Sequence, residues 1–236
     1  MLLEVIVTTL ADALAAERGG AGRVELVRDL ARGGMTPARD LVEQVLARVR
    51  IPVRVMVRET ESHTVGDGAI LDRLCDQARR LEDLAHAGGR SASGCLEGLV
   101  LGFARAGRPD LDATARVLAC APSLRATFHR AFDEVTDQPA GLQALARLPQ
   151  VDRVLLSGGR ADWAAGAAHL GVLAARAPRG LVLIAGYGVD AAAIAALRAA
   201  RVPCEVHVGR AARTPPHQDA PVDEVQVRAL VTRCRA

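Results

Sequence analysis

Eight short apolar runs recur along this chain, and a segment rich in Ala and Arg with helical spacing follows each of them. Runs of this length are typical of buried strands, and their alternation with helices indicates parallel βα units. The expected strands span residues 2–7, 23–27, 53–57, 96–101, 125–128, 151–155, 181–184 and 204–208. The expected helices span residues 12–18, 37–50, 69–87, 110–119, 139–148, 162–176, 190–200 and 222–234.

Eight βα pairs in 236 residues predict an α/β protein that forms a single (β/α)8 barrel, with one domain over residues 1–236. A doubly wound open sheet is the alternative, but that fold usually carries a glycine fingerprint after its first strand. Here Thr8-Thr9-Leu10 follows instead. The only low-complexity segment, the glycine- and serine-rich stretch 88–94, predicts a loop before the fourth strand.

The charged and sulfur-containing residues exclude several kinds of chemistry. All 30 basic residues are Arg, so no lysine is present for a Schiff base, a pyridoxal phosphate anchor or a P-loop. The basic residues are scattered among 27 acidic ones, and only 2% of residues are aromatic, so we expect no nucleic-acid partner. The five cysteines show no CxxC spacing, which argues against a zinc knuckle. No apolar stretch is long enough to span a bilayer, so we expect a cytoplasmic protein without a membrane partner.

Carboxylates inside two aliphatic strands are the first candidate functional groups. In a parallel barrel the functional side chains lie toward the carboxyl ends of the strands. Glu4 and Glu25 lie within the first two strands, where a carboxylate is costly unless it meets a cation or a metal. We expect both to point into the barrel and to pair with Arg58, Arg130 and the histidines at strand ends. A purely structural ion-pair network is the alternative, although two glutamates with several cations favour a site.

The densest polar cluster is Thr-Phe-His-Arg-Ala-Phe-Asp at residues 127–133, which begins at the end of the fifth strand. His129 is suited to act as an acid, a base or a ligand, and Arg130 to hold an anion through two hydrogen bonds. Asp133 would orient either of them. The alternative is a capped loop with a surface arginine.

Glycine loops follow the last two strands. Gly186, Gly188 and Gly209 resemble the loops from which many barrels offer backbone N–H groups to a phosphate, although tight turns also use such glycines. Ser157, followed by two glycines, has the same ambiguity. It is not a nucleophile elbow, because the G-x-S-x-G pattern is missing.

The remaining histidines and the sulfur atoms give weaker signals. Four histidines are expected to be exposed on loops or helix surfaces: His63, His86, His169 and His217. A soft Cu(I) site needs Cys, Met or His side chains close together. Cys204 lies near His207 in the sequence, and Met35 and Met56 would have to approach them. Buried core side chains explain the same residues equally well.

Taken in order, these segments resemble the CutC family of copper homeostasis proteins. The most specific segments are Gly-Gly-Met-Thr-Pro at 33–37 and Thr-Phe-His-Arg-Ala-Phe-Asp at 127–133, and the likeness extends over most of the chain. It implies a cytoplasmic (β/α)8 barrel, a homo-oligomer and a role in copper handling, with Cu(I) binding proposed for the family. The family often has cysteines where this chain has Ile6 and Val27, and of the family's Arg-Pro-Arg stretch after the third strand only Arg58 is kept.

Two functions are therefore predicted, and whether the chain is an enzyme stays open at this point. The first is a CutC-type protein of copper homeostasis that binds Cu(I), with unassigned metal ligands and no organic cofactor. The second is an enzyme that acts on a small phosphorylated or carboxylated metabolite by acid–base chemistry at the barrel mouth. In the second, the catalytic residues are Glu4, Glu25, His129 and Asp133, and the substrate-binding residues are Arg58, Arg130, Ser157, Gly186, Gly188, His207 and Gly209.

Overall fold

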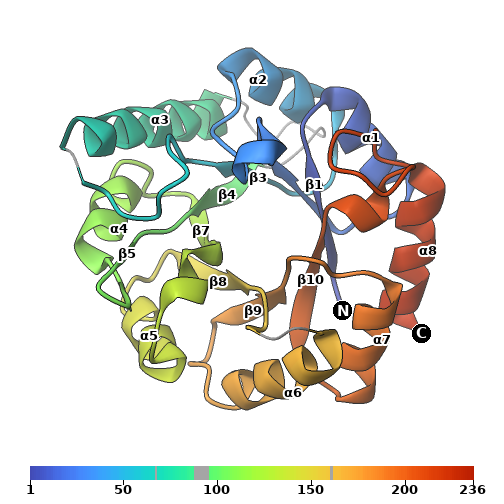
Figure 1. The fold of residues 1–236 in the computed structure, drawn as a ribbon. Coiled ribbons are helices and arrows are strands. Elements are labelled where there is room, and N and C mark those ends of the chain that lie inside the picture. The colour runs from blue at the N-terminus through green and yellow to red at the C-terminus, as the bar shows by residue number, and fades with distance from the viewer. Residues whose placement is uncertain (67, 88–95, 160–161) are drawn as a thin grey trace.

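Eight parallel strands close into a barrel in the computed structural model, which describes residues 1–66, 68–87, 96–159 and 162–236 (Figure 1). Around the barrel the strands follow the order β1-β10-β9-β8-β7-β4-β3-β2. The barrel strands are β1 (Leu3–Val7), β2 (Arg23–Leu26), β3 (Val53–Met56), β4 (Leu96–Leu101), β7 (Arg125–Phe128), β8 (Val151–Leu156), β9 (Val182–Ala185) and β10 (Cys204–Val208). The predicted (β/α)8 fold is confirmed, and the open-sheet alternative is wrong.

Helices surround the barrel and connect successive strands (Figure 1). They are α1 (Leu10–Arg18), α2 (Arg39–Arg48), α3 (Gly68–Ala87), α4 (Leu111–Leu118), α5 (Gln138–Leu145), α6 (Trp163–Ala174), α7 (Ala191–Ala199) and α8 (Glu224–Arg235). Side-chain caps fix several starts, because the Asp or Thr before the helix accepts an otherwise unpaired N–H of the first turn. Asp223 caps α8 in this way, so this helix starts two residues later than predicted. Within the described residues, no helix combines the length and the apolar character that a membrane crossing requires.

Short elements in the loops were not predicted by any sequence pattern. A two-stranded hairpin, β5 (Ala104–Arg105) and β6 (Arg108–Pro109), follows β4. Three short 3-10 helices, η1 (Leu30–Arg32), η2 (Arg130–Glu134) and η3 (Arg210–Ala212), follow β2, β7 and β10. All of them lie after the carboxyl ends of strands, so they shape the mouth of the barrel. The predicted loop at 88–94 lies outside the described residues.

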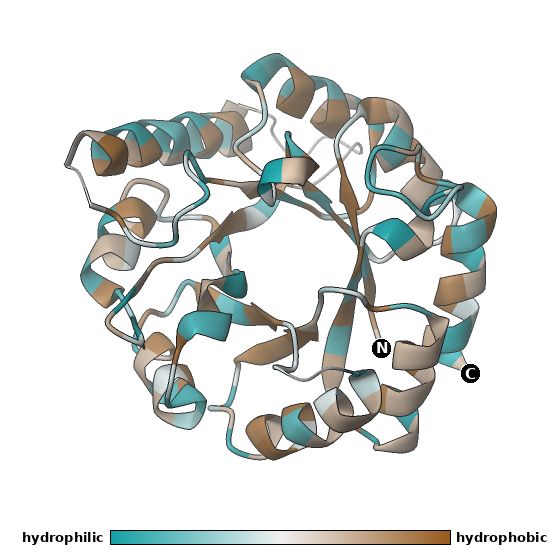
Figure 2. Ribbon diagram, in the orientation of Figure 1, coloured by the Kyte–Doolittle hydropathy of each residue, from teal (hydrophilic) through white to brown (hydrophobic). Residues whose placement is uncertain are grey.

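Side chains alternate between the two faces of each strand, and this alternation places charge inside the barrel. On β1, Leu3, Val5 and Val7 join the aliphatic core between strands and helices, where the ribbon is mostly hydrophobic (Figure 2). Glu4 and Ile6 belong to the opposite, inward face. Ile6 packs there in a small apolar cluster with side chains from β3, β4 and the end of β2.

A closed ring of ion pairs fills the amino-terminal half of the barrel. In this ion ring three arginines alternate with three carboxylates in the order Arg23, Glu97, Arg54, Asp152, Arg153 and Glu205. Arg54 Nε lies 2.6 Å from Glu97 Oε2, and its Nη1 lies 2.8 Å from Asp152 Oδ1. Both Arg23 and Arg54 are fully buried, so the carboxylates compensate charges that water does not reach.

Candidate functional site

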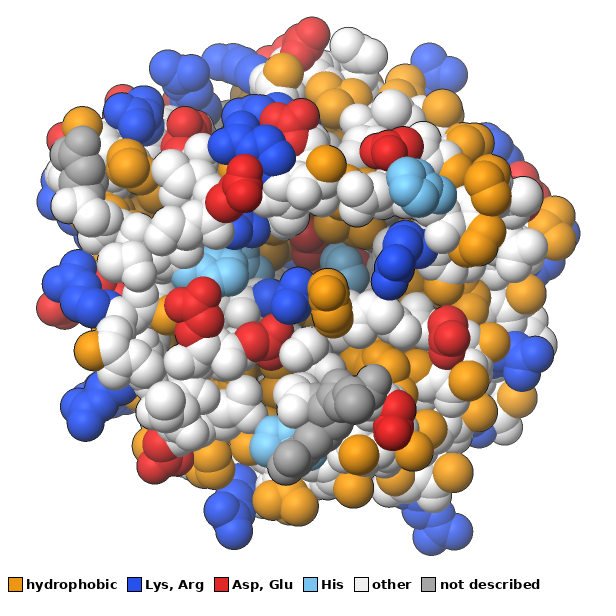
Figure 3. Space-filling view, in the orientation of Figure 1, with side chains coloured by type: hydrophobic (Ala, Val, Ile, Leu, Met, Phe, Trp, Pro, Cys, Tyr) orange, Lys and Arg blue, Asp and Glu red, His pale blue; other side chains and the backbone are white. Residues whose placement is uncertain are grey.

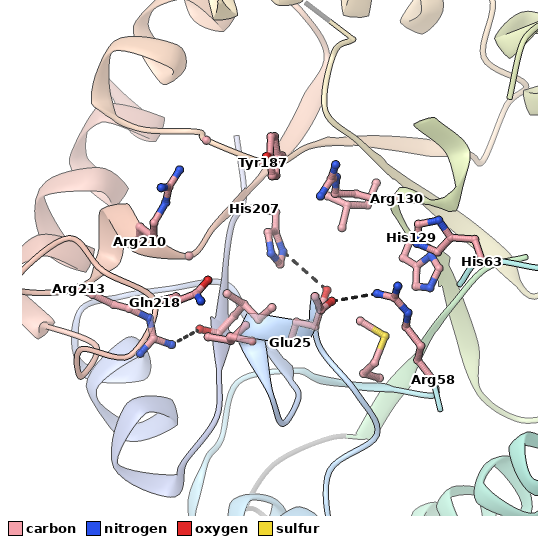
Figure 4. Close-up of a pocket in the computed structure, with 17 residues that line it drawn as sticks. Glu25, Arg58, His63, His129, Arg130, Tyr187, His207, Arg210, Arg213 and Gln218 are labelled. Atoms are coloured by element: carbon pink, nitrogen blue, oxygen red, sulfur yellow. Dashed lines mark hydrogen bonds and ion pairs between the residues drawn. The ribbon is translucent and has the colours of Figure 1, made fainter. Parts of the chain in front are cut away.

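A cavity of about 420 Å³ opens at the carboxyl ends of the strands. Figure 3 shows this face hollowed at its centre, with basic and histidine side chains around the opening and an acidic side chain deep inside. We call it the mouth cavity. Its polar lining residues are Glu25, Arg58, His63, His129, Arg130, Tyr187, His207, Arg210, Arg213 and Gln218, which Figure 4 labels.

The floor of the mouth cavity is built by three adjacent strands. β1 pairs with β10, with Glu4 opposite His207, and β1 also pairs with β2, with Ile6 opposite Glu25. This register brings the three side chains together. His207 Nδ1 lies 2.8 Å from Glu4 Oε1 and 3.7 Å from Glu25 Oε2. Glu25 Oε2 is buried and has no hydrogen-bond partner among the described residues, whereas Glu4 also accepts from Arg23 Nε.

The three floor groups influence one another's protonation. Burial raises the pKa of Glu25 to about 7, because the attraction of His207 only partly offsets burial and the negative charge of Glu4. Burial also acts to raise the pKa of Glu4, but Arg23 and His207 outweigh it and hold that pKa well below its usual range. For His207, burial acts to lower the pKa, and the attraction of Glu25 and the bond to Glu4 outweigh it, so the pKa is raised. Glu25 is therefore the group of the floor whose pKa lies near neutral pH.

His129 forms part of the wall as a neutral hydrogen-bond donor. It caps η2, and its Nδ1 accepts a hydrogen bond from the Ala131 N–H at 3.2 Å. Burial, with the neighbouring His63 and Arg58 charges, lowers the pKa of His129 well below its ordinary value. A neutral imidazole whose Nδ1 accepts carries its proton on Nε2. His129 is thus suited to polarise an oxygen atom rather than to act as a base.

His63 corrects the sequence prediction that this histidine is an ordinary surface residue. It lines the mouth cavity, and its ring centroid lies 5.1 Å from that of His129. Its Nδ1 lies 2.6 Å from Glu134 Oε1. The loop between β3 and α3 carries His63 to this position, and no local sequence signal indicates where such a loop folds. By contrast, His86 and His217 are largely exposed, as predicted.

The two predicted anion-binding arginines do not pair with the strand glutamates. Arg58 donates to the backbone carbonyls of Gly33, Thr60 and Glu61, and no carboxylate of the described residues lies within ion-pair distance. Arg130 pairs with Asp133 at 3.0 Å and lies over the Tyr187 ring, 4.0 Å from its centroid. The expected pairing of these two arginines with Glu4 and Glu25 is therefore wrong, whereas the expected pairing with a histidine is confirmed by His207. Arg23 pairs with Glu4 instead, and its position two residues before Glu25 on the same strand face was the available signal.

Asp133 and Ser157 lie behind the wall rather than in it. Asp133 Oδ1 accepts from the Ser157 backbone N–H at 2.9 Å, while Oδ2 accepts from Arg130 Nε. Neither residue is among those that line the mouth cavity. Asp133 therefore holds Arg130 against the loop that follows β8, and the Ser157 hydroxyl does not face the cavity as a substrate-binding group.

The glycine loops approach the cavity closely. Gly188 and Gly209 line it, and Gly186 lies behind it, where an added Cβ would be only 2.5 Å from a Leu155 methyl group. Between Gly186 and Gly188, Tyr187 has a positive φ of 64° and is 66% exposed. Such a backbone is uncommon for a bulky residue, and here it leaves the ring over Arg130.

One group of described residues could hold a metal ion: the donor atoms of Glu4, Glu25 and His207 lie within 4.8 Å of one another. Two carboxylates and one imidazole suit a hard or borderline cation and do not suit Cu(I). The sulfur atoms lie elsewhere. Met35 is buried outside the cavity, Met56 is the one sulfur residue among the lining residues, and Cys95 lies outside the described residues. Cys204 begins β10, at the opposite end from the cavity, and burial raises its pKa to about 12.

Comparisons with known proteins all indicate the same family. The model of the CutC family matches residues 1–212. The chain belongs to the CutC family. A relative from Xylella fastidiosa named family protein CutC is 35% identical over 92% of this chain and 79% of its own length. A mouse relative named copper homeostasis protein cutC homolog is 39% identical over 66% of this chain and 54% of its own.

A solved structure gives the same family. The structure of CutC from Streptococcus agalactiae superposes with a TM-score of 0.76 at 25% identity, covering 88% of this chain and 97% of that one. The resemblance seen in the sequence is thereby confirmed. At Ile6 and Val27 the resemblance seen in the sequence implies cysteines, and here both side chains pack with Met56 and Val100 in one apolar cluster. That cluster holds a single sulfur atom, so it provides no thiolate pair for Cu(I).

Proposed function

We propose that this CutC-family chain is an acid–base enzyme that acts on a small phosphorylated or carboxylated metabolite. One observation carries the proposal: Glu25 is a buried carboxyl group whose Oε2 has no hydrogen-bond partner among the described residues, and it lies on the floor of an arginine-rimmed cavity. Its pKa of about 7 suits proton transfer at neutral pH, because a general base works best when its pKa is near the working pH.

The neighbouring residues support a division of roles. Glu25 takes a proton from the substrate, and His207, which shares the floor, holds or relays that proton. Glu4 does not line the cavity and acts as a positioning residue, because its hydrogen bond fixes the orientation of the His207 ring. His129 donates its Nε2–H to a substrate oxygen.

The anionic group of the substrate binds at the arginine side of the cavity. Arg58 has no carboxylate partner among the residues that the structure describes, so its charge is available to an anion. Arg130 assists it and is positioned by Asp133, which the Ser157 N–H in turn holds. Gly188 and Gly209 allow the ligand close to the backbone, and Gly186 allows the loop to pack against Leu155.

Proton abstraction beside a carbonyl group fits this arrangement. In that step a C–H bond breaks, the proton moves to the Glu25 carboxylate, and the electron pair moves onto the carbonyl oxygen, to which His129 donates. Return of the proton to another atom would complete an isomerisation, and return to the same carbon would give exchange with solvent.

Hydrogen–deuterium exchange tests the proposal without knowledge of the product. The protein is incubated in D2O with pyruvate, 2-oxoglutarate, dihydroxyacetone phosphate or glyceraldehyde 3-phosphate, and loss of the carbon-bound proton is followed by NMR. We expect catalysed exchange in at least one compound and a decrease of about 10²- to 10⁴-fold in Glu25→Gln. Glu43→Gln, an exposed glutamate on α2, is the matched control. Exchange that is absent throughout, or equal in Glu25→Gln, would contradict the proposal.

Direct Cu(I) binding is a second candidate function. It is favoured by the name of the mouse relative and by one observation, that Met56 and His207 line the same cavity. An anaerobic Cu(I) titration against a chromophoric chelator tests it on wild type, His207→Ala and Cys204→Ala. Tight stoichiometric binding that is lost in His207→Ala would support copper handling in the cavity. Binding that is too weak to compete would count against it. The homo-oligomeric state and the cytoplasmic location stay predictions.

A further inference from the structure

Two cationic sides face each other across the floor of the mouth cavity. Figure 4 shows Arg58 and Arg130 on one side of Glu25 and His207, and Arg210, Arg213 and Gln218 on the other. The barrel order explains this separation. Arg58 and Arg130 follow β3 and β7, the two strands that flank β4, whereas the second side follows β10, which is opposite β4 in the closed barrel.

Arg213 provides a buried donor that lacks a partner. Its side chain is almost completely buried; Nη1 donates to the Ala220 carbonyl and Nη2 to the Ile6 carbonyl at 3.1 Å. Asp12 Oδ2 lies 3.5 Å from Nη1, so the guanidinium is rigidly held. Its Nε has no hydrogen-bond partner among the described residues, although the residue lines the mouth cavity. A buried N–H without an acceptor is costly, and a ligand in the cavity would remove that cost.

The other two residues on this side carry no compensating negative charge. Arg210 is exposed at the rim and forms no ion pair with any described residue, and Gln218 adds an amide. Across the whole described lining, four arginines face a single acid, Glu25. One anionic group at Arg58 and Arg130 would leave Arg210 without a counterion among the described residues. It would also leave the Nε–H of Arg213, whose charge Asp12 shares, without an acceptor.

We propose that the ligand of the mouth cavity is a short linear dianion, with one anionic group at Arg58 and Arg130 and the second at Arg210 and Arg213. Its middle carbons then lie over Glu25 and His207, so the identity of the reacting centre rests on the proposed acid–base function. Dicarboxylates and phosphorylated carboxylic acids share this chemistry. A cavity of about 420 Å³ accommodates a molecule of this size.

Calorimetric titration with matched pairs of ligands tests the proposal. The dianions are succinate, glutarate, adipate and 3-phosphoglycerate, and the monoanions are butyrate, pentanoate and hexanoate. We expect at least one dianion to bind about tenfold or more tightly than the monoanion of equal length, since a charge-assisted hydrogen bond is worth that much. Whether a dicarboxylate or 3-phosphoglycerate binds more tightly identifies the second anionic group as a carboxylate or a phosphate.

Variants assign the second anionic group to its side of the cavity. Arg210→Gln and Arg213→Gln should weaken the dianion about tenfold and leave the monoanion unchanged, and Arg147→Gln, which lies on the exposed connection before β8, should change neither. Arg210→Gln keeps the test valid if Arg213→Gln fails to fold. Equal affinity of dianions and monoanions, no binding of any dianion, or unchanged affinity in Arg210→Gln would overturn the proposal.

The same ligands separate this inference from the proposed function. Glu25-dependent exchange in D2O without any preference for dianions would leave the acid–base function standing and refute the two-ended ligand. A dianion preference that depends on Arg210, in a protein whose exchange activity is absent or unaffected by Glu25→Gln, would support the two-ended ligand and refute the acid–base function.

Discussion

The two halves of the barrel interior use the same residue types in opposite ways. In the amino-terminal half, the ion ring pairs each of its three arginines with carboxylates, and Glu97, Asp152 and Glu205 close the circle. In the carboxyl-terminal half, four arginines line a cavity whose lining has one carboxyl group. Charges that are fully compensated within the protein hold the barrel together. At the mouth, Arg130 and Arg213 each have one carboxylate behind the cavity wall, Asp133 and Asp12. Arg58 and Arg210 have none among the described residues, so their charges are available to a ligand.

Glu4 connects the two halves. One of its oxygens accepts from Arg23 of the ion ring, and the other accepts from His207 at the cavity floor. The rigidity of the ring is thereby passed to the imidazole, which keeps one orientation. The comparison also explains the pKa values. Glu4 has two hydrogen-bond partners and a lowered pKa, whereas Glu25, whose Oε2 has no such partner among the described residues, has a raised one.

The largest expected effect comes from opening the ion ring. Arg54→Met leaves Glu97 and Asp152 without their shared cation and should lower the free energy of unfolding by about 3–5 kcal/mol in urea denaturation. Arg228→Met removes an exposed pair with Glu224 and should cost less than about 1 kcal/mol. Equal losses in the two variants would show that the ring is no more important for stability than a surface pair.

The next effect is a pH dependence of stability that originates in the cavity floor. The folded pKa of Glu25 is raised from 4.5 to about 7, so the folded protein holds a proton that the unfolded chain releases. The contribution of Glu25 to stability is therefore complete below pH 4.5 and is lost as pH rises from 4.5 through 7, by on the order of 3 kcal/mol. The raised pKa of His207 acts in the same direction.

Urea denaturation from pH 4.5 to 8 measures this dependence. Glu25→Gln keeps the shape of the side chain without a titrating group, and it should flatten the curve and be more stable than wild type at pH 8. A wild-type slope retained in Glu25→Gln would mean that the proton belongs to another group.

A smaller effect is expected where a carboxylate only positions a cavity cation. Asp133→Asn removes the ion pair that holds the half-exposed Arg130, so anion affinity should fall by a factor of about three to ten. The ion ring is unaffected, and the unfolding free energy should change by less than about 2 kcal/mol. Titration with 3-phosphoglycerate measures the first quantity and urea denaturation the second. Affinity equal to wild type would remove Asp133 from the site.

The smallest effect concerns the exposed ring above Arg130. Tyr187→Asn loses the contact with the guanidinium but relieves the positive φ of 64°, which Asn tolerates better. These two terms are each below about 1 kcal/mol and oppose each other. We expect the melting temperature to stay within about 3 °C of wild type. A larger decrease would mean that Tyr187 contributes to the stability of the fold, as the ion ring does.

The sequence alone determined the barrel and the strands that build its site. Strand and helix periodicities repeat eight times, and parallel strands end at one face, so Glu25, His129, Arg58, Arg130 and His207 were predicted to converge. All five line the mouth cavity. Local spacing suffices here because alternation within a strand fixes which side chains point into the barrel.

Tertiary structure alone decided which charged side chains pair with one another. Strand register places Glu4 beside Arg23 and His207, and it closes the ion ring from residues that are up to 182 positions apart. Loops bring His63, Arg210 and Arg213 to the cavity. Asp133 and Ser157 instead lie behind the cavity wall, where they hydrogen-bond to each other. Strand register and loop conformation depend on contacts between segments that are distant in the sequence. Local sequence patterns therefore cannot predict them.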